Sequence, residues 1–148
     1  MPEEYNLDYL GVDIIDELLD YAKTKAPKNY RFIKHQELSV PAKSESVDMI
    51  CAFSLFTHLT HHESFIYLQE MHRVLKPKGI LVFSFLEFES LKHWSVFLST
   101  VESQKNGTLP HLNTFIEKSV IKIWADKLNF EIIEIFEEGQ TMVILKRK

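Results

Sequence analysis

The acidic residue Asp13 ends a short apolar run in the stretch "YLGVDII" at residues 9–15. In a nucleotide-binding α/β sheet, an acid at the carboxyl end of a strand can accept hydrogen bonds from both vicinal hydroxyls of a ribose. Such an acid normally lies about 20 residues after a glycine-rich loop. Only 12 residues precede Asp13, and Gly11 is the only glycine among them. Asp13 is therefore a candidate ribose ligand, with a solvated acid or a helix cap as the alternatives.

A second polar group is the cluster of His58, His61, His62 and Glu63. Histidines three or four residues apart can share one face of a helix and bind a metal, and an imidazole can act as a general base. Thr60 and Glu63, however, have the spacing of a capping box, which is typical of the first turn of a helix. We therefore expect a solvated helix start here and no metal site.

Composition limits the function classes. The 148 residues are enough for one domain with a real core. The net charge of −4 leaves no basic excess for phosphate backbones, so nucleic acid is not an expected partner. No apolar stretch reaches the ~18 residues of a membrane span, and the start "MPEEYN" lacks the order of a signal peptide. A cytoplasmic protein with no membrane partner is expected.

The single cysteine, Cys51, lies in an apolar run and is expected to be buried.

Alternating strand and helix patterns predict the elements that position these residues. Strands are predicted at 9–15, 30–35, 47–53, 80–86, 130–136 and 141–146. Helices are predicted at "ELLDYAKTKAP" (17–27), from Thr60 to a stop at "KPKG" (76–79), at 90–104, and after Thr114 and Glu117, which repeat the capping-box spacing. The helix at 90–104 is predicted to be amphipathic, because Leu91, Trp94, Leu98 and Val101 form an apolar stripe along it. The alternation favours a parallel α/β sheet, and apolar strands such as 47–53 are typical of a sheet covered on both faces. Only "EEGQ" separates the last two strands, which is long enough for an antiparallel hairpin but not for a parallel crossover.

These pieces, in this order, resemble a class I S-adenosylmethionine-dependent methyltransferase of the small-molecule type. The similarity extends from Tyr9 to Lys146, and its most specific part is "VDMICAFSLFTHLTHHESFIYLQEMHRVLKPKGILVFSF". This stretch resembles the family's fourth strand, the helix after it, and the turn "R-V-L-K-P-G-G" into the fifth strand. Here the turn is "RVLKPKG", with Lys78 where glycine is usual. "GVDII" resembles the end of the second strand, and the terminal hairpin resembles the sixth and seventh strands.

The resemblance implies a Rossmann-like α/β fold, mostly parallel with a C-terminal antiparallel hairpin, in a single domain over residues 1–148. It also implies that the domain is incomplete at its N-terminus, because the family's first strand and glycine-rich loop are missing. No two of the four glycines are close enough for a G-x-G. In the family the first strand lies between the second and the fourth. Three explanations stay open: the chain is a fragment, a second chain or a homodimer partner fills the gap in the sheet, or the fold has closed up.

The resemblance also assigns residues to the cofactor. Asp13 corresponds to the acid that holds the ribose, and Ile14 to a residue that packs against the adenine, although an apolar residue there is also ordinary core. Gln36, five residues before Pro41, corresponds to a position where the family often has an acid that accepts from the adenine amino group. A glutamine carbonyl can accept that bond, and a polar loop residue is the alternative.

Phe53 and Ser54 follow the strand at 47–53 and are expected to border the cofactor, because ligands lie at the carboxyl ends of parallel strands. Phe53 is otherwise a core residue. Phe85, Phe88 and Trp94 are candidates for an acceptor pocket, but each is more simply a core side chain, and "EFES" places acids near the expected pocket mouth. No catalytic residue is assigned, because the sulfonium is already activated and methyl transfer depends mainly on alignment.

The function implied by the resemblance is S-adenosylmethionine-dependent methyl transfer to a small-molecule acceptor. The alternative is a non-catalytic methyltransferase-like module for binding or assembly, which the missing loop favours. A nicotinamide-dependent dehydrogenase is a poorer match, because it needs the same absent glycine loop. For this chain alone, weak or absent binding of S-adenosylmethionine is expected.

Overall fold

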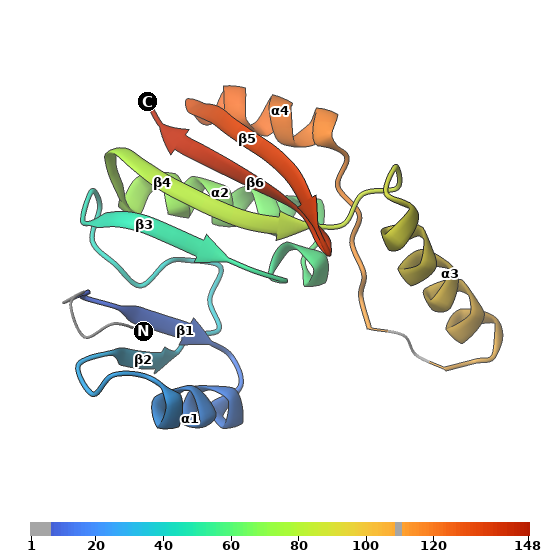
Figure 1. Cartoon of the computed structure of the whole chain (residues 1–148), viewed down its shortest axis with the longest axis horizontal. Coiled ribbons are helices and arrows are strands. Elements are labelled where there is room, and N and C mark those ends of the chain that lie inside the picture. Colours follow the sequence, from blue (N-terminus) through green and yellow to red (C-terminus); the bar gives the residue numbers. More distant parts are fainter. Residues whose placement is uncertain (1–6, 109–110) are drawn as a thin grey trace. The chain divides into compact units, whose positions relative to one another are not determined.

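The computed structural model describes residues 7–108 and 111–148, in which strands and helices alternate (Figure 1). The elements in chain order are β1 (Leu10–Asp13), α1 (Asp16–Lys25), β2 (Arg31–Lys34), β3 (Val47–Ala52), the 3-10 turn η1 (Phe56–His58), α2 (His61–Val74), β4 (Leu75–Phe85), α3 (Leu91–Lys105), α4 (Lys118–Lys127), β5 (Phe130–Glu138) and β6 (Gln140–Arg147). The predicted order of strands and helices is confirmed. The chain divides into two compact units between Pro41 and Ala42. Within the described ranges, no helix is long and apolar enough to cross a membrane.

The first unit pairs β1 and β2 in parallel, with Asp13 opposite Lys34. Helix α1 follows β1 and buries Leu19. Gly11 in β1 lies against the ring of Phe32, so closely that a Cβ atom there would come within 2.5 Å of the ring. Because the strands are parallel, their carboxyl ends lie at the same edge of this small sheet.

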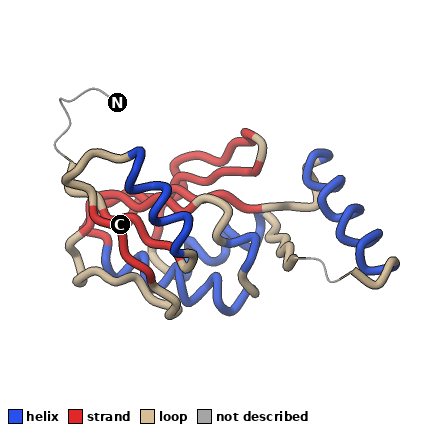
Figure 2. The backbone as a smooth tube through the Cα atoms, turned by 90° about the horizontal axis from the view of Figure 1, so that it is seen from below, coloured by secondary structure: helices blue, strands red, loops and turns tan. Residues whose placement is uncertain are grey.

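The second unit contains a four-stranded sheet in the order β3-β4-β6-β5. Strands β3 and β4 are parallel, and β6 is antiparallel to both β4 and β5, so β6 runs against the other three strands of this sheet. Figure 2 shows β5 and β6 as a hairpin with a tight turn. Gly139 suits that turn, because its φ of 77° lies in the left-handed region that favours glycine. The predicted fold class and the C-terminal antiparallel hairpin are confirmed.

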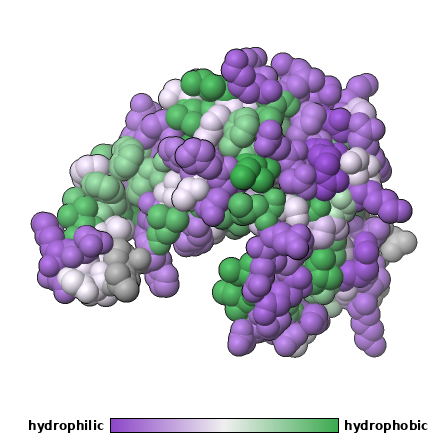
Figure 3. All heavy atoms as spheres, turned by 180° about the vertical axis from the view of Figure 1, so that it is seen from behind, coloured by the Kyte–Doolittle hydropathy of each residue, from purple (hydrophilic) through white to green (hydrophobic). Residues whose placement is uncertain are grey.

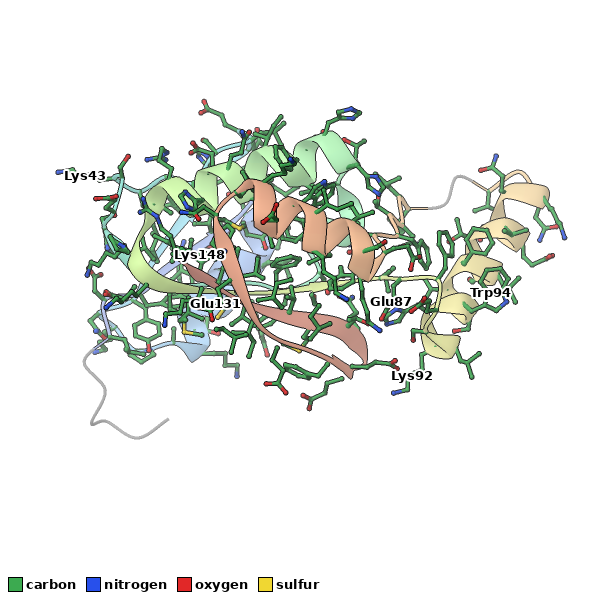
Figure 4. The ribbon with its side chains drawn as sticks, turned by 90° about the horizontal axis from the view of Figure 1, so that it is seen from above. Lys43, Glu87, Lys92, Trp94, Glu131 and Lys148 are labelled. Atoms are coloured by element: carbon green, nitrogen blue, oxygen red, sulfur yellow. The ribbon has the colours of Figure 1, made fainter. Side chains whose placement is uncertain are left out.

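Helices α2 and α4 lie on one face of the four-stranded sheet, behind it in Figure 1 and above it in Figure 4. Both helices turn apolar side chains toward the strands, and most of the remaining core comes from the sheet, with Phe56 from η1 and Ile116 from the segment before α4. The largest fully buried apolar side chains are Phe56, Phe83, Phe85, Leu68, Leu75, Leu81, Ile116, Ile121, Leu145 and Val74. Phe85 is therefore a core residue and does not line an acceptor pocket.

The expectation of a buried Cys51 is wrong, because its side chain is exposed. Strand β3 is at one end of the strand order, and side chains alternate between its two sides. Ile50 is half-buried and Ala52 is buried, whereas Met49 and Cys51 on the other side are exposed. The expectation that this strand is covered on both faces is therefore also wrong for the second unit as described.

The start of α2 confirms the predicted capping box. The Thr60 hydroxyl accepts from the backbone N–H of Glu63 at 3.3 Å, and the Glu63 carboxylate accepts from the backbone N–H of Thr60 at 2.8 Å. The Thr60 N–H and the Thr60 hydroxyl both donate to the Glu63 carboxylate, and these two hydrogen bonds lower the pKa of Glu63. The end of α2 differs from the prediction, because β4 begins at Leu75 and contains the expected stop at 76–79.

The second predicted capping box is wrong. Helix α4 begins at Lys118 with Glu117 at its N-cap, and no side chain caps it. The backbone N–H of Thr114 donates to the carbonyl of Thr57 at 2.8 Å. The Glu117 carboxylate accepts from the backbone N–H of Phe88 at 3.0 Å. Contacts with distant parts of the chain therefore replace the local cap.

Helix α3 is present as predicted, but its apolar stripe is not buried. Leu91 is 89% exposed, Trp94 is 43% exposed and Leu98 is 47% exposed. Figure 3, seen from behind, shows hydrophobic surface over this helix. The buried residue of α3 is His93, so the helix contacts its unit through another face. The expectation that Trp94 lies in the core is wrong.

Candidate functional site

Asp13 and Gln36 lie at the carboxyl edge of the two-stranded sheet in the first unit. Asp13 is the last residue of β1, and Gln36 follows the end of β2 by two residues. Gln36 and Ile14 are exposed, and Asp13 is half-buried. One oxygen of the Asp13 carboxylate accepts from the backbone N–H of Ile15 at 2.9 Å, which fixes the turn before α1. The alternative role of a helix cap is not seen, because the N-cap residue of α1 is Ile15 and no side chain caps the helix. A carboxylate has four lone-pair sites, and this single bond is compatible with further hydrogen bonds from a ribose.

Phe53 and Ser54 lie at the carboxyl end of β3 in the second unit. Phe53 is 58% exposed and is not a core residue. The φ of Ser54 is 55°, a left-handed conformation that is uncommon for a residue with a side chain. The backbone N–H of Ser54 donates to the Ser84 hydroxyl at 2.8 Å, and its own hydroxyl accepts from the Gln140 amide at 3.1 Å. Strained backbone of this kind is often found at functional sites, where surrounding contacts hold it in place.

The carboxyl end of β4 and the start of β6 lie at the same edge of the four-stranded sheet as the carboxyl end of β3. This follows from the topology, because β4 is parallel to β3 and β6 is antiparallel to β4. The edge carries buried polar groups. Among the described residues, Gln140 Oε1 at the start of β6 is buried without a hydrogen-bond partner. A buried polar atom without a partner is costly, and a bound ligand is one way to satisfy it.

A buried acid follows the end of β4. Glu87 is 1% exposed. Its Oε1 atom lies 3.0 Å from the Lys118 ammonium of α4 and accepts a hydrogen bond from the Thr141 hydroxyl of β6. The hydrogen bond to Glu87 raises the pKa of Lys118, which keeps this lysine cationic. We call these residues, with His93, the Glu87 cluster.

His93 fixes the start of α3 to the loops at this edge. Its Nδ1 atom accepts from the backbone N–H of Glu87 at 3.1 Å. Its Nε2 atom lies 2.9 Å from the Gly139 carbonyl and, because Nδ1 is the acceptor, Nε2 is the nitrogen that donates. His93 is 2% exposed. The imidazole therefore joins the end of β4 to the hairpin turn.

Four aromatic side chains lie beside this loop. Phe88 and Phe115 are stacked with ring centroids 4.5 Å apart, and Trp94 and Phe97 are stacked at 4.9 Å. Phe88 also meets Phe97 edge-on at 5.3 Å. We call these four residues the aromatic cluster. Phe88 and Trp94 are nearly half exposed, so the cluster offers flat apolar surface to solvent.

Two histidines near the start of α2, His58 of η1 and His61 of α2, contact backbone carbonyls of a distant segment. His58 Nδ1 lies 3.1 Å from the Leu112 carbonyl, and His61 Nε2 lies 3.0 Å from the Phe115 carbonyl. Their side chains hold the extended segment before α4, and both are exposed. The exposure agrees with the expected solvated helix start.

Sequence reasoning found the strand ends of this site but only part of its polar network. The acids of "EFES" were placed near the pocket mouth, and Glu87 is the first of them. Thr141 and His93 carried no local signal. Thr141 is 54 residues from Glu87 in sequence, and His93 lies off the apolar stripe of its helix.

Comparisons with known proteins identify a family and a fold for this chain. A model of the methyltransferase domain family matches residues 1–83. The structure of a SAM-dependent methyltransferase from Methanosarcina mazei has a TM-score of 0.73 at 18% identity, over 93% of this chain and 81% of that chain. A Pyrococcus horikoshii protein has a TM-score of 0.73 at 20% identity, over 99% of this chain and 74% of that chain.

A third structure is magnesium protoporphyrin IX methyltransferase from Synechocystis with bound SAH. Its TM-score is 0.69 at 14% identity, over 94% of this chain and 64% of that chain. At such identities the likeness shows the fold alone, which is that of a Rossmann-like methyltransferase. No curated protein matches the sequence.

Proposed function

Because the chain belongs to the methyltransferase domain family, we propose that it transfers the methyl group of S-adenosylmethionine to a small-molecule acceptor. The observation that carries this proposal is the match over residues 1–83, which contains all five residues assigned to the cofactor. In each unit these residues follow the carboxyl ends of strands. That is the edge at which α/β sheets bind their ligands.

The residues present fit the adenosyl end of the cofactor. The Asp13 carboxylate would accept from the ribose hydroxyls, and the Gln36 carbonyl would accept from the adenine amino group. Ile14 is exposed and apolar, which suits contact with the flat adenine, and the exposed ring of Phe53 follows the end of β3, where it would border the cofactor. Ser84 holds the backbone N–H of Ser54 and Gln140 holds its hydroxyl, which suits a residue that must be fixed beside a ligand.

The aromatic cluster supports a flat or apolar small molecule as the acceptor. It lies directly after β4, beside the same edge of the four-stranded sheet as Ser54. The bound cofactor supplies an activated methyl group. The residues of the chain then need to align the acceptor and to exclude water, for which apolar rings are suited.

A second candidate function is a non-catalytic module for binding or assembly. It is favoured by the glycine pattern, because Gly11, Gly79, Gly107 and Gly139 form no G-x-G. Without such a loop, little is assigned to the methionine end of the cofactor. We therefore propose weak binding of the cofactor by this chain alone.

A titration with S-adenosylhomocysteine, monitored by ligand-detected NMR, separates the methyltransferase function from the non-catalytic module. The test variant is Asp13→Asn, which keeps an oxygen for the Ile15 N–H but loses the charge. The control variant is Asp20→Asn, which changes an exposed acid on α1. Loss of charge-assisted bonds worth about 1.5 kcal/mol weakens binding about tenfold. We expect that loss for Asp13→Asn and none for Asp20→Asn. Equal binding by all three proteins opposes the cofactor role of Asp13, and no binding at millimolar ligand supports the non-catalytic module.

The expected partner at the sheet gap, a second chain or a second copy, stays a prediction. Edge strands such as β3 of the four-stranded sheet can pair with another chain. Light scattering over a range of protein concentrations tests it. A mass that doubles with concentration supports a homodimer, and a constant monomer mass opposes it.

A further inference from the structure

Three carboxylates converge at the end of β4, outside the residues assigned to the cofactor. Oxygens of Glu87, Glu89 and Glu117 lie within 4.8 Å of one another. Two come from the loop after β4, and the third comes from the N-cap of α4. Figure 4 shows Glu87 at the end of the sheet nearest α3. The elements that meet here are all in the second unit.

One carboxylate oxygen in this group is buried and unsatisfied. Glu87 is 99% buried, and its Oε1 atom is held by Lys118 and Thr141. Its Oε2 atom has no hydrogen-bond partner among the described residues. A buried charged oxygen without a partner is expensive. This oxygen therefore points to a missing donor or cation, independently of the clustering of the acids.

We propose that Glu87, Glu89 and Glu117 bind a hard divalent cation of the size of Ca²⁺. Hard cations prefer oxygen ligands, and carboxylates are their usual protein ligands. Two ligands of one ion are at most twice the metal–oxygen distance apart, which is about 4.6–5.2 Å for Ca²⁺ and about 4.0–4.2 Å for Mg²⁺. Carboxylate oxygens that all lie within 4.8 Å of one another are close enough for small side-chain movements to bring them onto one ion. Ca²⁺ accepts several carboxylates in an irregular geometry, whereas Mg²⁺ usually binds one or two carboxylates in a near-ideal octahedron, so three carboxylates favour Ca²⁺.

A solvent-open hollow of about 370 Å³ gives access to the site and is lined by Glu89, Glu117, Lys118, Ser119 and Lys122. The hollow leaves room for water molecules, which complete the coordination of Ca²⁺. The two lysines oppose a cation. The Lys118 side chain is 40% exposed, so it can turn from Glu87 into solvent. The cation and the Lys118 ammonium therefore compete for the same carboxylate.

Isothermal titration of the full chain with CaCl₂ tests the site. The variants Glu89→Gln and Glu117→Gln each remove one charged ligand and keep the side-chain shape. Loss of a direct ligand weakens binding by at least about tenfold, which is the lower end of the effect of changing an outer-shell partner. The control is Glu131→Gln, an exposed acid at the other end of the sheet in Figure 4. We expect one Ca²⁺ per chain, tighter than Mg²⁺, with Glu131→Gln unchanged.

The variant Lys118→Gln separates a cation site from a simple ion pair. If the carboxylates bind Ca²⁺, this variant binds it more tightly, because the competing ammonium is gone. If the Lys118 ammonium alone balances the charge of Glu87, the variant loses folding stability and gains no affinity for Ca²⁺. Circular dichroism confirms that each variant is folded. No heat of binding with millimolar CaCl₂, or equal weakening by Glu131→Gln, overturns the proposal. The result is independent of S-adenosylhomocysteine binding, so its failure and that of the proposed function are distinguishable.

Discussion

Replacing His93 with leucine tests the network that holds the end of β4. The imidazole accepts from the buried backbone N–H of Glu87 and donates to the carbonyl of Gly139. Leucine fills a similar volume but makes neither bond. The structure therefore predicts a loss of folding stability without a large cavity.

The magnitude follows from the two groups that lose their partner. The Glu87 N–H belongs to a residue that is 1% exposed, and an unsatisfied buried donor costs about 1–3 kcal/mol. The Gly139 residue is exposed, so its carbonyl can bind water and only about 0.5–1.5 kcal/mol is lost there. The expected sum is about 1.5–4.5 kcal/mol, a large part of the roughly 5–15 kcal/mol of a typical domain.

Urea denaturation followed by circular dichroism measures this loss. The matched control is His62→Leu, an exposed histidine at the start of α2, for which a change within about 0.5 kcal/mol is expected. His93→Gln is expected to recover part of the loss, because its amide carries both an acceptor and a donor. If His93→Leu costs no more than His62→Leu, the imidazole does not join the β4 loop to the hairpin, and the network is refuted.

Three further predictions concern the fold. Lys78→Gly is expected to stabilise the chain by about 0.5–1 kcal/mol, because Lys78 has a φ of 67° and glycine relieves that strain. A lower free energy of unfolding for this variant in urea denaturation contradicts the prediction. Thr60→Ala is expected to lower the free energy of unfolding by about 1 kcal/mol and Thr60→Ser to retain it, since only alanine removes the cap of α2; equal values for both exclude a capping role. Burial and the charge of Arg147 lower the pKa of His72 below its ordinary 6.5, so the unfolded chain binds more protons and stability falls as the pH drops below about 6.5. His72→Leu is expected to be less sensitive than the wild type between pH 7 and pH 5, and parallel stability profiles contradict this.

Local patterns predicted the elements of the fold well. The spacing of Thr60 and Glu63 predicted the cap of α2, and the four residues of "EEGQ" predicted the antiparallel hairpin. Both features depend on residues close in sequence. The same spacing at Thr114 failed, because Glu117 accepts from a backbone N–H that is 29 residues away.

Apolar patterns predicted which side chains share a face but not what covers that face. The stripe containing Leu91, Trp94 and Leu98 is helical as predicted, yet these side chains are exposed. Cys51 is exposed for a related reason, because β3 is at one end of the four-stranded sheet. Burial depends on neighbours supplied by distant segments, which periodicity does not describe.

In the candidate site, too, local features could be predicted from sequence and contacts between distant segments could not. The carboxyl ends of strands could be located from sequence, and Asp13, Gln36 and Phe53 each lie at or just after such an end. That the three share one cleft stays a prediction. The contacts of Glu87 with Thr141 and Lys118 join segments 54 and 31 residues apart. No spacing rule within one element predicts such contacts.

Protein-detected NMR with S-adenosylhomocysteine is the most direct test of the central claim, that the residues assigned to the cofactor bind its adenosyl group. The backbone amide signals of Ile14, Gln36, Phe53 and Ser54 are followed as the ligand is added to the full chain. We expect these signals to shift with dissociation constants in a weak range, and the signal of the exposed residue Glu131 to stay unchanged. No shift of these signals at millimolar ligand, or an equal shift of the Glu131 signal, would contradict the claim.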